Sequence, residues 1–262
     1  MGEGKDLLNT YVVLAVREDR ASVLEAAARQ PKYAGHLWRL IAEAAAGGWT
    51  ALGGPTEWGK LKMAQSNPLK SNSGMLTLAL LYREFRRDNP TKNYDSPEFL
   101  AYMAKIEGAV SHFADTTSDA LKDLTDGADK PDIAVAYESE ALAALEKGLT
   151  GYRIVYPAPT IPVLVPIAPV SAAWMTDAKK QTGQDFIYYL QSDAVQQKAL
   201  DFGYRPVAPS LAPQIREYIS ATKRQAAGFQ PAPQTAGSAT TSKEKEGLIY
   251  VWSQWYNKAT GQ

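Results

Sequence analysis

Two short segments rich in hydroxyl and amide side chains are the strongest candidates for a binding site in this chain. "SNSG" (71–74) precedes the apolar run "MLTLALLYREF", and "TT" (116–117) opens the run "TTSDALKDLTDG". The first N–H groups of a helix lack partners and carry partial positive charge, so such segments can bind anions. The same residue types also form ordinary helix caps. The candidates are Ser71, Asn72, Ser73, Gly74, Thr116 and Thr117.

A third candidate lies at the end of a predicted strand. Tyr137 and Glu138 follow four apolar residues, 133–136. In open α/β sheets, ligands bind outside the carboxyl ends of the strands. A glutamate at this place can also form a structural ion pair with a basic neighbour.

Catalytic and metal chemistry find little support in the sequence. The two histidines, His36 and His112, are far apart, and each lies in a predicted helical pattern that favours a core or surface role. The chain has no cysteine, which excludes disulfides, thiolate metal sites and a cysteine nucleophile. No HExxH, GxSxG or phosphate-loop motif occurs. The sequence therefore predicts a protein that is not an enzyme and has neither cofactor nor metal.

The charge balance argues against nucleic-acid and membrane partners. The chain has 28 basic and 28 acidic residues among 262, so no net field attracts nucleic acid or anionic lipid. No apolar run reaches the roughly 18 residues needed to span a bilayer. The first residues, "MGEGKDLLNTYVVLAV", lack the layout of a signal peptide. We therefore expect a soluble chain without an export signal of its own.

The pattern of apolar residues predicts alternating strands and helices. Strands are expected within 11–19, 60–68 and 133–136, and an extended, proline-rich crossover within 153–170. Such alternation is typical of α/β proteins with mostly parallel sheets. Helices are expected within 20–30, 34–48, 73–87, 96–113, 116–127, 138–147, 182–207 and 247–259.

Five segments resemble, in the same order, the extracytoplasmic solute-binding proteins of ABC transporters. The resemblance covers most of residues 8–208 and is to the two-lobed class that includes sulfate, thiosulfate, molybdate and ferric-iron binders. Within that class, the chain is most similar to bacterial extracellular solute-binding proteins often encoded beside von Willebrand A-type domains. The matching segments are "YVVLAVRED", "SNPLKSNSG", "PDIAVAYESEAL", "IVYPAPTIPVLVPIAPV" and "FIYYLQSDAVQQKALDFGYRPV".

This resemblance implies a two-lobed, type II periplasmic-binding-protein fold with mixed or parallel sheets flanked by helices. Family members normally begin with further strands and helices of the N-terminal lobe, so the first lobe is expected to be incomplete. Residues 14–155 would form the second lobe. Residues 1–13 and 156–262 would form the crossovers and the C-terminal part of the first lobe, with a flexible loop at 225–246.

The resemblance also implies a function. The chain would capture a small, anionic ligand between two lobes by hinge closure and deliver it to the membrane permease of an ABC importer, outside the cytoplasm. Residues 71–74 and 116–117 would donate hydrogen bonds from helix ends, and Tyr137 and Glu138 would contact the ligand from a strand end. Glu138 suits an anion only when it is protonated or binds a cation alongside the anion, so a hydrated metal or a neutral polar solute stays open as ligand.

The alternative is a sensor or interaction module of the same fold, acting with a partner such as a von Willebrand A-type protein. An incomplete lobe would expose sheet edge and apolar surface, which predicts a homodimer or a segment swap. Trp49 and Trp58 either pack their glycine-rich loop against the lobe or form an exposed patch for a partner. Arg205 is expected to form a structural ion pair rather than to bind an anion.

Overall fold

The computed structural model describes residues 4–125, 130–235 and 241–261. In this part of the chain one mixed sheet has the order β3-β2-β4-β1-β5, and β6 and β7 pair with the other half of β1. β2 is parallel to β3 and β4, whereas β1 is antiparallel to all of its partners. The sheet is therefore mixed rather than mostly parallel. Its strands are β1 (Lys5–Arg17), β2 (Met63–Ser66), β3 (Val110–Ala114), β4 (Ile133–Tyr137), β5 (Tyr152–Val155), β6 (Pro162–Ile167) and β7 (Arg205–Pro206).

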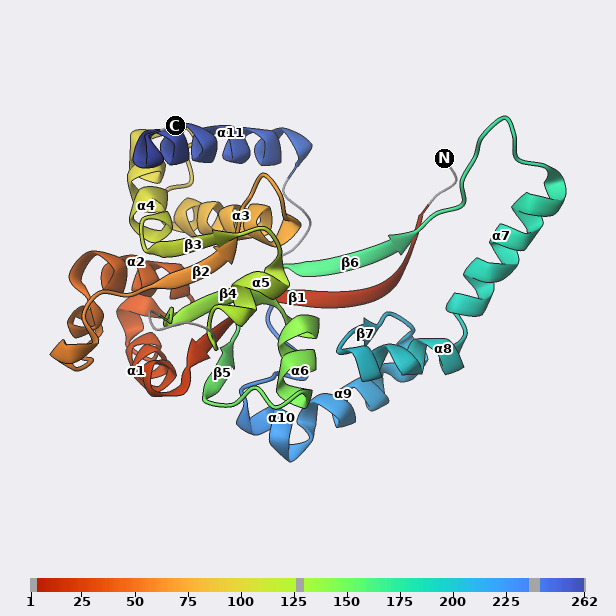
Figure 1. Ribbon diagram of the computed structural model, residues 1–262, viewed down its shortest axis with the longest axis horizontal. Coiled ribbons are helices and arrows are strands. Elements are labelled where there is room, and N and C mark those ends of the chain that lie inside the picture. The colour runs from red at the N-terminus through yellow and green to blue at the C-terminus, as the bar shows by residue number, and fades with distance from the viewer. Residues whose placement is uncertain (1–3, 126–129, 236–240, 262) are drawn as a thin grey trace.

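Helices cover both faces of the sheet (Figure 1). The first five of these helices are α1 (Glu18–Ala28), α2 (Leu37–Gly47), α3 (Asn72–Asp88), α4 (Pro97–Glu107) and α5 (Thr117–Lys122). The others are α6 (Glu138–Glu146), α7 (Asp177–Leu190), α8 (Asp193–Lys198), α9 (Ala212–Ser220), α10 (Thr222–Ala226) and α11 (Ser242–Thr260).

The alternating side chains of β1 divide the buried interior into two cores. Val12, Leu14 and Val16 point to one face, where they pack against α1, α2, α3, α4 and α11. Val13 and Ala15 point to the other face and pack against α5, α6 and α9. Because both faces of this strand are covered, its central residues form a continuous apolar run rather than an alternating one.

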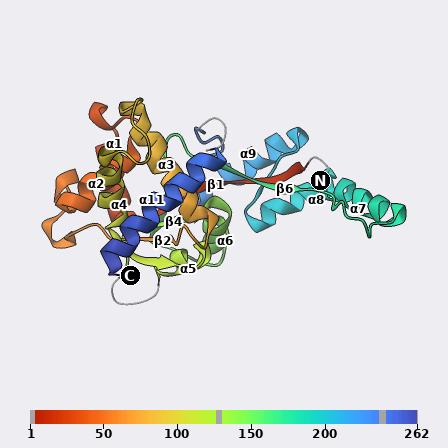
Figure 2. The ribbon, with the colours of Figure 1, turned by 90° about the horizontal axis from the view of Figure 1, so that it is seen from above.

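The first half of β1 and its partner β6 extend away from this body as an arm. Figures 1 and 2 show that the arm leads to α7, which stands apart from the body, and Figure 1 shows α8 next to β7. The arm carries many large apolar side chains that face solvent. They are Leu164, Val165, Val170, Trp174, Phe186, Tyr188, Tyr189, Phe202 and Val207.

One local prediction was wrong. The helix expected over 96–113 ends at Glu107, and Val110–Ala114 form the edge strand β3, so His112 lies on a strand. The reason is that the turn at Gly108 lets the chain reverse and pair with β2.

The segment 225–246, expected to be a flexible loop, contains the end of α10, a buried Phe229 and the first turn of α11. Residues 236–240 lie outside the described residues. α11 packs on α3, and its Trp252 ring lies 5.3 Å from that of Phe113. This last helix therefore joins the body built from 14–155, while the division of the chain into lobes stays a prediction.

Candidate ligand-binding site

Three helices begin at the same edge of the sheet. β2 leads through a short loop into α3, β3 leads into α5, and β4 leads directly into α6. Since β2 is parallel to β3 and β4, the carboxyl ends of these strands lie side by side. The three helix N-termini therefore meet at one place, which is where ligands bind in open α/β sheets.

Four hydroxyl groups come together at this edge and are called here the hydroxyl cluster: those of Ser66, Ser71, Ser73 and Thr117. The Ser73 Oγ lies 2.6 Å from the Ser66 Oγ and 2.6 Å from the Thr117 Oγ1. The Ser71 Oγ lies 3.2 Å from the Ser73 Oγ and 3.4 Å from the Thr117 Oγ1. Ser66, Ser73 and Thr117 are buried, whereas Ser71 is partly exposed. The buried hydroxyls thus position the one hydroxyl that solvent reaches.

The two predicted helix ends differ in how they are capped. Thr116 is the N-cap of α5, and its Oγ1 accepts a hydrogen bond of 3.1 Å from the Asp119 backbone N–H. Ser71 is the N-cap of α3, but its side chain forms no capping hydrogen bond. Thr116 is therefore an ordinary cap, while the hydroxyl of Ser71 leaves the first N–H groups of α3 without a side-chain cap.

Asn72 and Tyr137 lie at the rim of the same site. The Asn72 Nδ2 donates to the Tyr137 hydroxyl over 3.2 Å. Burial raises the pKa of Tyr137 to about 12, so the phenol stays protonated at neutral pH. The pair presents an amide and a phenol, both neutral, beside the start of α3.

Glu138 is buried and is held by partners from the other half of the chain. Its carboxylate accepts a hydrogen bond of 2.8 Å from the Arg205 Nε and a second one from the Arg205 Nη2. It also accepts a hydrogen bond from the Tyr156 hydroxyl. The ion pair expected for Arg205 is thus present. Among the described residues, Glu138 shares no hydrogen bond with the hydroxyl cluster.

Gly74 lies against backbone rather than at an open surface. A Cβ at this position would come within 2.2 Å of the Ser66 carbonyl oxygen and 2.8 Å of the Pro68 nitrogen. The missing side chain therefore allows α3 to approach the loop after β2 closely.

Ser66 belongs to the cluster but was not among the predicted site residues. Its signal was available, because it is the last residue of β2 and opens the stretch "SNPLKSNSG". The parallel pairing of β2 with β3 is what brings Thr117 next to it.

Other residues singled out in the sequence have structural surroundings. Trp49 is buried, and its ring meets that of Trp58 edge-on with centroids 5.8 Å apart. Of the two predicted alternatives, these residues therefore follow the first: they pack their glycine-rich loop. His36 and His112 lie at the start of α2 and on β3. Within the described residues, no group of three or more His, Cys, Asp or Glu could hold a metal ion. In the same residues, no helix is both long and apolar enough to cross a bilayer.

Comparison with known proteins identifies the family. The family model described as bacterial extracellular solute-binding protein matches residues 2–205. No curated protein matches the sequence.

Several solved structures have a similar fold. The sulfate-binding protein SubI from Mycobacterium tuberculosis H37Rv has 17% identity and a TM-score of 0.57, over 95% of this chain and 69% of that one. The substrate-binding protein of an ABC transporter from Agrobacterium tumefaciens has 15% identity and a TM-score of 0.54, over 96% of this chain and 66% of that one. Maltose-bound MalE3 of T. maritima has 13% identity and a TM-score of 0.58, over 99% of this chain and 68% of that one. At these identities the neighbours establish the fold. The match of the family model over residues 2–205 shows that this chain belongs to the family of bacterial extracellular solute-binding proteins.

Proposed function

We propose that this chain captures a small oxyanion at the hydroxyl cluster and delivers it to the membrane permease of an ABC-type importer, in the periplasm or at the cell exterior. The observation that carries the proposal is the uncapped start of α3 with the hydroxyl of Ser71 held beside it. Binding in this way needs no covalent chemistry.

The chemistry of the site favours an anion. A helix N-terminus carries the equivalent of about half a positive charge. Three neutral groups beside it can donate hydrogen bonds: the Ser71 hydroxyl, the Asn72 amide and the Tyr137 phenol.

Two carboxylates lie nearby in the chain. That of Glu138 is compensated by Arg205, and that of Glu140 accepts a hydrogen bond from the Ser118 hydroxyl and has its pKa raised by burial, which favours the neutral form.

Hinge motion would close the site. β1 runs from the body into the arm, and the segment between β5 and β6 makes the same crossing (Figure 1). In the proposed division, 14–155 forms one lobe, and 1–13 with 156–262 forms the crossovers and part of the other. Residues of the arm would then approach a ligand held at the start of α3.

The test is a thermal-shift series with sulfate, molybdate and phosphate on the wild type and on Ser71→Ala. A ligand at a hundred times its dissociation constant stabilises a protein by about 2.7 kcal/mol, which raises Tm by several degrees. We expect one of these oxyanions to raise the Tm of the wild type by this amount. The same oxyanion should raise the Tm of Ser71→Ala by clearly less. The matched control is Ser96→Ala, because Ser96 caps α4 away from the hydroxyl cluster.

Other outcomes separate the remaining ligands. A shift with calcium or ferric citrate but with none of the oxyanions would favour a cation and bring Glu138 back as a ligand. If an oxyanion raised the Tm of the wild type and of Ser71→Ala equally, its binding site would not be at the start of α3.

A second candidate function is an interaction module with a protein partner, such as a von Willebrand A-type domain. The observation that favours it is the exposed aromatic surface of α7, where Phe186, Tyr188 and Tyr189 are each more than half exposed. The absence of any ligand-induced shift would support this function over solute capture.

A further inference from the structure

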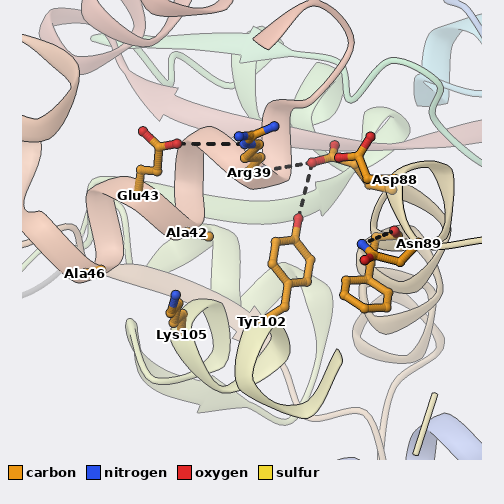
Figure 3. Close-up of a pocket in the computed structure, with 10 residues that line it drawn as sticks. Arg39, Ala42, Glu43, Ala46, Asp88, Asn89, Tyr102 and Lys105 are labelled. Atoms are coloured by element: carbon orange, nitrogen blue, oxygen red, sulfur yellow. Dashed lines mark hydrogen bonds and ion pairs between the residues drawn. The ribbon is translucent and has the colours of Figure 1, made fainter. Parts of the chain in front are cut away.

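A second concave site lies at the opposite end of α3. A cavity of about 330 Å³ opens between α2, α3 and α4 (Figure 3). It reaches Phe85 and Asp88 near the end of α3, whereas the hydroxyl cluster surrounds the start of that helix. A helix of 17 residues is roughly 25 Å long, so the two sites are separate.

The walls of the cavity are partly apolar. Ala42 and Ala46 line it from α2, Phe85 from α3, and the ring of Tyr102 from α4. Ala42 and Phe85 are buried in the protein core on their other sides. These surfaces can cover the flat, apolar body of a small molecule.

Two of the three acidic side chains that line the cavity accept hydrogen bonds within the protein. The Glu84 carboxylate accepts hydrogen bonds from the backbone N–H of Trp38 at 3.1 Å and of Arg39 at 2.7 Å, and from the Tyr102 hydroxyl at 3.2 Å. Glu43 accepts from the Tyr33 hydroxyl. The Asp88 Oδ2 lies 3.7 Å from the His36 Nδ1, which is beyond hydrogen-bond distance, and half of this side chain is exposed to solvent.

The two basic groups are different. The Arg39 Nε and the Glu43 Oε1 form an ion pair across one turn of α2, but at 3.8 Å they are beyond hydrogen-bond distance, so the guanidinium N–H groups can still donate to a ligand. Lys105 has no hydrogen-bond or ion-pair partner among the described residues, and Figure 3 shows its ammonium group pointing from α4 toward α2. The unused hydrogen-bond donors of the cavity thus come from a guanidinium and an ammonium group on facing helices.

We propose that this cavity is a second ligand site, which binds a small organic carboxylate with a flat apolar body. Arg39 and Lys105 hold the carboxylate from α2 and α4, and the body rests on Ala42, Ala46 and Phe85. An arginine pairs well with a carboxylate because its planar N–H groups match the two oxygens. This site is independent of the oxyanion site at α3.

The test is isothermal titration calorimetry with benzoate as the probe and with benzamide as its neutral analogue. We expect benzoate to bind the wild type and benzamide to bind at least about tenfold more weakly, because it lacks the charge. The double variant Arg39→Ala/Lys105→Ala should lose at least about tenfold in benzoate affinity. The matched control is Lys60→Ala, which removes an exposed cation outside the cavity and should bind benzoate as the wild type does.

A second variant tests the cavity itself. Ala46→Leu keeps both cations and fills part of the space, and leucine is well tolerated in helices. It should also weaken benzoate binding. The proposal is overturned if benzoate does not bind, if it binds equally to the double variant, or if Ala46→Leu leaves its affinity unchanged. The last result would place the anion on surface charges outside the cavity.

Discussion

Glu107 is a carboxylic acid buried among aromatic and apolar side chains. Its Oε2 accepts hydrogen bonds from the Trp252 Nε1 at 2.7 Å and from the Gln65 Nε2 at 2.8 Å, which joins α4, α11 and β2. No cation pairs with it among the described residues. Burial therefore raises its pKa from 4.5 to about 7. Glu84 behaves similarly, because burial raises its pKa to about 7 in spite of its backbone hydrogen bonds.

A pKa raised on folding makes stability depend on pH in a definite direction. The protonated form of Glu107 is favoured in the folded protein, so this stabilisation is complete below about pH 4.5 and is lost as the pH rises through 7. The loss for one such group is about 3 kcal/mol. Glu107→Gln keeps the shape and an acceptor for Trp252 but cannot ionise. We expect this variant to be more stable than the wild type at pH 8, and to lose less stability between pH 5 and pH 8, as measured by urea unfolding.

The control for this prediction is Glu57→Gln, which changes an exposed carboxylate. Its unfolding curves should follow those of the wild type at both pH values. The assignment fails if Glu107→Gln loses as much stability with rising pH as the wild type does. Part of the pH dependence should persist in the variant, because Glu84 titrates in the same range.

At the scale of elements, the position of α3 depends on its close approach to the loop after β2. Gly74→Ala would place a Cβ 2.2 Å from the Ser66 carbonyl oxygen, and backbone cannot rotate away as a side chain can. We expect a loss of about 1–3 kcal/mol in the free energy of unfolding. The shift of α3 should also disturb the hydrogen bond between Ser66 and Ser73. Chemical denaturation measures the first effect, and oxyanion thermal shifts measure the second.

The chain provides a matched glycine for comparison. Gly183 also lies in a helix, α7, but a Cβ there would meet no atom within 4 Å. Gly183→Ala should therefore stabilise the protein by about 0.5–1 kcal/mol, since alanine favours the helix. If both substitutions had the same sign, close packing at Gly74 would not be the explanation.

At the scale of the whole molecule, the body is well covered and the arm is not. Trp174, Phe186 and Tyr189 leave 55–63% of their surface in contact with solvent. Burial of such surface against a second copy would be favourable. We expect the sedimentation coefficient to rise with protein concentration. The double variant Phe186→Ser/Tyr189→Ser should reduce this rise.

Tyr250→Ser is the control for association, because Tyr250 is equally exposed but lies on α11 in the body. It should associate as the wild type does. A wild type that sediments as a monomer at every concentration would contradict the prediction of a homodimer. It would also show that the arm stays solvated in spite of its aromatic side chains.

The sequence by itself determined several of the local elements and the candidate segments. The β-branched run of β1, the Asn-Pro turn before α3, and the Ser96-Pro97 start of α4 depend on neighbouring residues, so their patterns were sufficient. Ser71, Ser73 and Thr117 were named from helix-start chemistry alone. The order of the segments also indicated the family, which the match over residues 2–205 confirms.

Only the tertiary structure decided which of these groups meet. The contact between Ser73 and Thr117 joins residues 44 apart and exists because β2 and β3 are parallel neighbours. The pairing of Glu138 with Arg205 joins residues 67 apart, and it gives Glu138 a charge partner that local sequence could not identify. Local patterns fix helices and strands because those depend on neighbours in the chain, whereas a site is made by pairings between distant segments.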